Sequence, residues 1–119
     1  MNREKIIKYM NEKYHNLQEY PWEDKPSYTT FKHENNKKWF ALIMDVPFEK
    51  LKIEKQGKVD IINLKNIPEI IGSLRKQPGI LPAYHMNKEH WITVLLDGSV
   101  SEEKIYELID VSYELTKKK

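Results

Sequence analysis

Several things that would point to a particular chemistry are missing from this sequence of 119 residues. It has no cysteine, which excludes disulfides, thiolate catalysis and zinc-finger sites. Its four glycines form no glycine-rich turn between a strand and a helix, which excludes a Rossmann site or a P-loop. No apolar run approaches the roughly 20 residues that cross a bilayer, and the charged start at residues 1–5 is unlike a signal peptide. We therefore expect one cytoplasmic domain over residues 1–119, with no membrane partner.

Hydrophobic periodicity predicts an α+β fold. Ile6, Ile7, Met10, Tyr14 and Leu17 recur at helical spacing, which predicts a helix over 3–17 that Asn2 can cap. The stretch "QEYPWEDKPSY" reads as an irregular connection because of its two prolines. The remaining elements are strands at 27–33, 39–46, 59–65 and 91–97, a short helix at 68–76 and a last helix from Ser101 to about Thr116. The order α-β-β-β-α-β-α predicts a two-layer sandwich, an antiparallel sheet covered by helices.

The stretch "PAYHMNKEHW" (82–91) concentrates residues that often carry chemistry. His85 and His90 are five residues apart, whereas a metal site on one helix needs a spacing of three or four, and the motif HEXXH is absent. We therefore predict no metal and no cofactor here. Asn87 and His85 are suited to holding an irregular loop through backbone hydrogen bonds. Tyr84 and Trp91 would then fill the edge of the core.

The serines and the acids of the last helix do not indicate catalysis. Ser101 is explained as a helix cap, and no GxSxG elbow occurs, so we expect that the protein is not an enzyme. Spacings of four, three and four place four acids in one narrow stripe, which is typical of a solvated outer face. The alternative is a weak cation-binding ridge of oxygen ligands. The four acids are Glu103, Glu107, Asp110 and Glu114.

Basic residues gather at the turns although the net charge is only +2. Lysines at hairpin tips can lie against phosphates, as in winged DNA-binding proteins, and such contacts position a protein without reading sequence. The alternative is solubilising lysine on surface turns. The candidate DNA-binding residues are Lys37 and Lys38 on the first hairpin, Lys50, Lys52, Lys55 and Lys58 on the second connection, and Arg75, Lys88 and His90 near the stretch 82–91.

Two long blocks, "LPAYHMNKEHWITVLLDGSV" and "IYELIDVSYELT", resemble the signature of the MmcQ/YjbR family of small bacterial proteins. The signature residues are Tyr84, His85, Asn87, Trp91, Asp97 and Gly98. The resemblance implies a CyaY-like, frataxin-like fold and DNA binding through two hairpin wings, here residues 35–38 and 49–58. Relatives often carry an acid where this chain has Ile67, so the short helix loses a side-chain cap.

Two functions remain open from the sequence. The first is a monomeric, non-enzymatic DNA-binding protein that contacts phosphates through its wings. The second is a module that binds a protein or a small ligand in a cleft near Trp22, Tyr84 and Trp91, because aromatic residues lie there beside polar groups.

Overall fold

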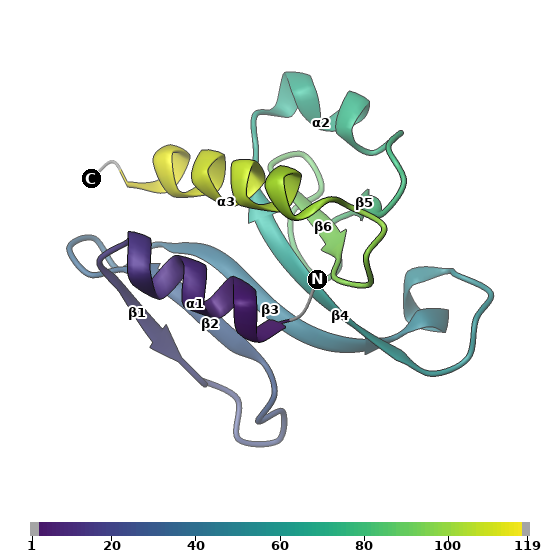
Figure 1. The fold of residues 1–119 in the computed structure, drawn as a ribbon, viewed down its shortest axis with the longest axis horizontal. Helices are drawn as coiled ribbons and strands as arrows, with labels where there is room; N and C mark the ends of the chain where they lie inside the picture. The colour runs from purple at the N-terminus through teal and green to yellow at the C-terminus, as the bar shows by residue number, and fades with distance from the viewer. Residues whose placement is uncertain (1–2, 118–119) are drawn as a thin grey trace.

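The computed structural model describes residues 3–117, which form one six-stranded sheet and three α-helices (Figure 1). All neighbouring strands are antiparallel, in the spatial order β1-β2-β3-β4-β6-β5. Among the described residues, no helix has the length and apolar character needed to cross a membrane. The elements are α1 (Arg3–Lys13), β1 (Asn16–Glu19), β2 (Thr29–His33), β3 (Trp39–Pro47), the 3-10 helix η1 (Phe48–Leu51), β4 (Lys58–Lys65), α2 (Pro68–Leu74), β5 (Ile80–Pro82), β6 (Trp91–Leu95) and α3 (Glu102–Thr116).

The mixed α+β class and the antiparallel sheet are confirmed, but the predicted order lacked two edge strands. The first helix ends at Lys13, and Leu17 lies in β1 instead. The sequence Asn-Leu-Gln-Glu of β1 has no β-branched or aromatic residue, so pattern reasoning missed it. Strand β5 has three residues and ends in Pro82, so it is too short to show the alternation of apolar and polar residues that predicts a strand. Asn2, the expected cap of α1, lies outside the described residues.

One face of the sheet packs against helices. Figure 1 shows α1 and α3 lying across the strands, and Ile6 and Met10 of α1 are fully buried there with Ile105 and Ile109 of α3. Ser101 caps α3 as predicted, because its side chain accepts a hydrogen bond from the Lys104 amide. The main core therefore lies between this face and the two terminal helices.

Side chains also bind α1 directly to α3. The rings of Tyr9 and Tyr106 stack with centroids 3.9 Å apart. Asp110 accepts hydrogen bonds from the hydroxyls of Tyr9 and Tyr14 and from Lys13, whose Nζ lies 2.9 Å from Oδ2. The prediction that Asp110 belongs to a solvated outer stripe is therefore wrong. Asp110 lies on the side of α3 that faces Tyr9 and Lys13 of α1.

The opposite face of the sheet carries a second apolar cluster that loops cover. Leu42 and Met44 of β3 and Ile61 of β4 are buried there, and Trp22 and Tyr84 pack on them from loops.

A bulge in β3 places neighbouring aromatic side chains on opposite faces of the sheet. Phe31 pairs with Ala41 but Lys32 pairs with Trp39, so Phe40 is the extra residue. Phe40 consequently joins Ala41 in the helix-side core, while its neighbour Trp39 packs on the loop side.

Candidate functional site

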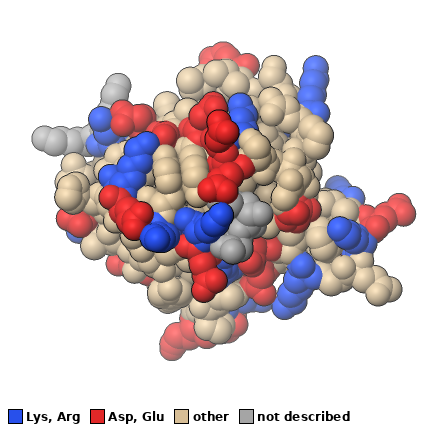
Figure 2. All heavy atoms as spheres, viewed as in Figure 1, with Lys and Arg blue, Asp and Glu red and all other residues tan. Residues whose placement is uncertain are grey.

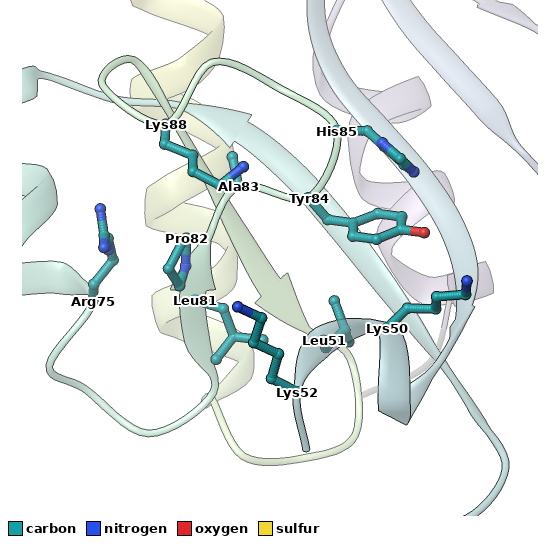
Figure 3. A pocket seen from close by; sticks show the side chains of 10 residues that line it. All are labelled: Lys50, Leu51, Lys52, Arg75, Leu81, Pro82, Ala83, Tyr84, His85 and Lys88. Atoms are coloured by element: carbon teal, nitrogen blue, oxygen red, sulfur yellow. The ribbon is translucent and has the colours of Figure 1, made fainter. Parts of the chain in front are cut away.

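The two hairpin wings lie at opposite ends of β3. The turn that carries Lys37 and Lys38 precedes β3, and the connection 48–57 follows it. A strand of nine residues spans about 30 Å, so the wings do not form one patch. The structure instead brings the second wing close to the stretch 82–91 (Figure 3). Predicted site residues from three separate segments therefore meet at one place.

That place is a hollow of about 660 Å³, named here the cationic hollow. Its floor is largely apolar, and four of its lining residues are basic, with no carboxylate among them. Figure 3 shows Lys52 and Lys88 on one side of the Tyr84 ring, and Lys50 and His85 on the other. The lining residues are Lys50, Leu51, Lys52, Arg75, Leu81, Pro82, Ala83, Tyr84, His85 and Lys88. Four cations in a lining that has no carboxylate favour an anion.

Short turns hold these basic residues in place. Lys50 lies in η1, and Lys52 ends that helix in a left-handed conformation with φ 61°, its amide donating to the Glu49 carbonyl at 3.1 Å. Arg75 caps the C-terminus of α2. All four basic side chains belong to exposed residues, so each can reach a ligand from the rim.

The loop 82–91 is tied to the sheet by buried polar residues that sequence reasoning missed. Asn63 of β4 is fully buried; its Nδ2 donates to the Tyr84 carbonyl at 2.9 Å, and its Oδ1 accepts from Thr93 Oγ1 at 2.5 Å. The Tyr84 amide in turn donates to Thr93 Oγ1 at 2.8 Å. An asparagine in the middle of the apolar strand "VDIINLK" was the available signal, because a buried amide needs partners.

The two residues expected to hold the loop behave differently. Asn87 Oδ1 accepts from the amides of Glu89 at 2.8 Å and His90 at 3.2 Å, which is the backbone role expected for it. His85 has a left-handed backbone, with φ 60°, and its ring lies 4.0 Å from the Tyr84 ring centroid. Left-handed backbone is uncommon outside glycine. Here it places an exposed imidazole on the wall of the hollow.

A second hollow of about 470 Å³ adjoins the first and is named here the aromatic hollow. Lys50, Tyr84 and His85 line both hollows, so they form the shared wall. The indole of Trp22 lies edge-to-face against Trp39, with ring centroids 5.8 Å apart. The lining residues are Trp22, Asp24, Lys25, Tyr28, Trp39, Leu42, Met44, Lys50, Tyr84, His85 and Met86. Trp91, which the sequence grouped with Trp22 and Tyr84, lines neither hollow.

Other candidate cations are placed elsewhere or are already engaged. Lys58 Nζ lies 3.7 Å from Asp45. A hydrogen bond from Ser27 and the charge of Lys58 lower the pKa of Asp45, although burial opposes them. Lys55 Nζ lies 5.0 Å from the Phe48 ring centroid. Lys37 Nζ donates to the Glu34 carbonyl at 2.7 Å. The cationic hollow thus includes four of the nine candidates.

The remaining predicted residues have structural surroundings. The His90 carbonyl accepts from the Asn66 amide at 2.9 Å, and its side chain lies outside both hollows. Asp97 Oδ1 accepts from the Ser99 amide at 3.0 Å across Gly98, which has φ 94°. Burial of Asp97 opposes its ionisation, but the bonds from Ser99 lower its pKa. Within residues 3–117, no three His, Asp or Glu side chains are grouped to hold a metal ion.

Charge on the helix-bearing face is distributed differently. Acidic and basic side chains are interspersed there over α1 and α3 (Figure 2). Lys5 lies 3.6 Å from Glu102, and Lys117 lies 3.0 Å from Glu114. Such pairing leaves no single sign to attract a charged partner. The cationic hollow is therefore the better candidate site.

Comparison with known proteins gives consistent matches over nearly the whole chain. The family model described as YjbR matches residues 11–115. The uncharacterized protein YyaQ of Bacillus subtilis is 49% identical over 117 residues, covering 98% of this chain and 99% of that protein. A crystal structure of a protein from Pseudomonas syringae has a TM-score of 0.95 at 53% identity, covering 98% of this chain and 100% of that chain. The protein DR2400 of Deinococcus radiodurans has a TM-score of 0.74 at 30% identity, covering 98% of this chain and 78% of that chain.

Proposed function

Because this chain belongs to the YjbR family, we propose that it is a non-enzymatic DNA-binding protein, the function that its resemblance to that family implied. We place DNA binding at a single site, the cationic hollow. The observation that carries the proposal is the convergence of Lys50, Lys52, Arg75 and Lys88 without a carboxylate. Each would contact a phosphate from the rim, and such contacts dominate affinity for nucleic acid. The protein would act as a monomer in the cytoplasm, on a frataxin-like scaffold. The net charge of +2 predicts modest affinity.

This proposal reduces the set of wing residues that contact DNA. Lys50 and Lys52 of the second wing contact DNA, together with Arg75 and Lys88. Lys37 and Lys38 lie at the far end of β3 and stay outside the site. Lys55, Lys58 and His90 lie outside the hollow as well and contribute only to the surrounding potential.

The test is fluorescence anisotropy with a random-sequence duplex at several salt concentrations. Replacing Lys50 and Lys88 by glutamine removes two phosphate contacts, so the slope of log affinity against log salt should fall by about 2. The matched control replaces Lys37 and Lys38 by glutamine, which removes the same charge from the first wing. We expect the control to keep the wild-type slope. Equal losses in both variants would contradict a single site. No binding of either the duplex or a single strand at low salt would contradict the function.

The hollows also favour a second candidate, a small anionic ligand. Their volumes of about 660 and 470 Å³ lie in the range of ligand pockets. This candidate retains Trp22 and Tyr84 from the sequence-based cleft but not Trp91. Titration with a nucleoside monophosphate, followed by the indole NMR signals, tests it. Shifts of the Trp22 signal by the mononucleotide, with none on adding a single-stranded oligonucleotide, would favour the small ligand over the nucleic acid.

A further inference from the structure

We propose that the nucleic acid bound at this site is single-stranded, and that one of its bases enters the aromatic hollow. This inference rests on the proposed function, since it names the form of nucleic acid that the cationic hollow takes. The observation behind it is the shared wall of the two hollows. Lys50, Tyr84 and His85 face the cationic hollow on one side and the aromatic hollow on the other.

The two hollows have complementary chemistry. The first has four cations and an apolar floor, which suits a phosphate and the sugar beside it. The second has two indoles, two phenol rings and two methionines, which suit the flat face of a base. A nucleotide joins a phosphate to a base over a short distance, as these two hollows are joined. A duplex keeps its bases stacked inside, so it could use only the first hollow.

The polar residues of the aromatic hollow also favour a base as its ligand. Asp24 lines it and is exposed, so its carboxylate can accept from the amino or imino group of a base. Lys25 beside it lies with Nζ 5.8 Å from the Tyr28 ring centroid. An acyl chain would form no hydrogen bond with these polar groups, whereas a base edge provides donors and acceptors. The hollow therefore suits a base better than a purely apolar ligand.

Hydrogen bonds and ring contacts hold the residues that line the hollows. Asn63 and Thr93, on the loop-bearing face of the sheet, hydrogen-bond the backbone of Tyr84. Trp22 is held edge-to-face by both Trp39 and Tyr28. A nucleic-acid strand that binds here meets preformed aromatic surfaces, which lowers the entropy cost of association.

The experiment compares three probes of equal length on the wild-type protein. They are a single-stranded oligonucleotide, the corresponding duplex, and an abasic strand that keeps every phosphate but has no bases. We expect the single strand to bind about tenfold more tightly than the abasic strand, as one stacked base provides. The Trp22→Ala variant should lose that advantage and retain its affinity for the abasic strand.

Tryptophan fluorescence gives a second readout that does not depend on truncating Trp22. The chain has three tryptophans, of which Trp22 and Trp39 line the aromatic hollow and Trp91 does not. The variant Trp22→Phe/Trp39→Phe keeps the aromatic surface and leaves Trp91 as the only indole. Base stacking should quench wild-type emission and leave emission of this variant unchanged.

The outcomes separate the inference from the function on which it rests. Equal affinity for the single and abasic strands, or tighter binding of the duplex, overturns the inference and leaves phosphate binding in place. Quenching that persists in the Trp22→Phe/Trp39→Phe variant also overturns it, because Trp91 would then be the reporter. Failure of all three probes to bind at low salt overturns the proposed function itself.

Discussion

The two faces of the sheet are both apolar, yet they are covered in different ways. On the helix side, α1 and α3 give continuous cover, and side chains such as Phe40 and Ile105 have no exposed surface. On the loop side, short segments cover Leu42 and Met44 incompletely, and two hollows remain between them. Helices pack without gaps because their side chains interdigitate regularly, whereas loops follow no such period. One face therefore provides stability, and the other contains the two hollows at which we propose binding.

The largest effect should come from damaging the helix-bearing side at Gly79. A Cβ there would lie 2.7 Å from both Ser99 Cβ and Val100 Cγ2, just where the chain enters α3. The φ of +83° adds backbone strain for any side chain. We expect Gly79→Ala to lower the free energy of unfolding by about 3 kcal/mol. Denaturant unfolding followed by tryptophan fluorescence measures this.

Gly57→Ala is the matched control for that prediction. Gly57 also has positive φ, +92°, but nothing lies within 4 Å of its Cβ position. It should cost about 1 kcal/mol, from backbone strain alone. Both changes affect the unfolded chain equally, so their difference isolates the steric clash. Equal losses would mean that the chain around Ser99 moves aside freely.

An intermediate effect should follow from loosening the loop side at Asn63. Asn63→Ala leaves the Tyr84 carbonyl and the Thr93 hydroxyl without their buried partner. We expect a loss of about 2 kcal/mol in unfolding free energy. Combining it with Thr93→Val should cost clearly less than the sum of the two single changes, because both remove the same network. Additive losses would contradict that coupling. The control is Asn11→Ala at an exposed position, which should change the free energy of unfolding by no more than about 0.5 kcal/mol.

The smallest effect should come from the link between α1 and α3 at Asp110. Burial raises the pKa of Asp110, but hydrogen bonds from Tyr14, Lys13 and Tyr9 more than offset it, so the pKa is lowered. We expect Asp110→Asn to cost about 1 kcal/mol at neutral pH, a modest figure because the side chain is 37% exposed.

The pH dependence of that variant checks the cause. A lowered pKa adds stability above the ordinary value of 3.8, and that stability is lost as the pH falls through the folded-state pKa. The difference between wild type and Asp110→Asn should therefore disappear in acid. A difference that persists at low pH would assign the effect to packing. Glu107→Gln, on the exposed side of α3, should change stability little at any pH.

Much of the fold could be predicted because its longer elements have strong apolar patterns. Strands β3 and β4 were placed within a residue or two because each is a long, nearly continuous buried run, and helix α3 because its buried residues recur at helical spacing. The two edge strands left no such signal, because β1 is only partly buried throughout and β5 has three residues. The bulge at Phe40 also has no local signature, because it arises from how β3 pairs with β2.

The candidate site was predictable in its residues but not in its grouping. Lysine at turns marked both wings equally, and only the three-dimensional arrangement separates Lys50 and Lys52 from Lys37 and Lys38. Arg75 joins the site from the end of α2, far along the sequence from the second wing. Asn63 was overlooked because a single polar residue in an apolar strand carries little weight in a periodicity argument. Its role depends on partners that only the fold brings near.

The short edge strands have a consequence for how concentrated protein should behave. Strand β5 exposes few unpaired backbone groups, and Pro82 at its end has no amide hydrogen to offer a neighbouring chain. Strand β1 at the other edge has only four residues. Sheets grow into fibrils by adding strands at long, flat, unpaired edges. A sheet of six strands that ends this way on both sides is a poor template for amyloid.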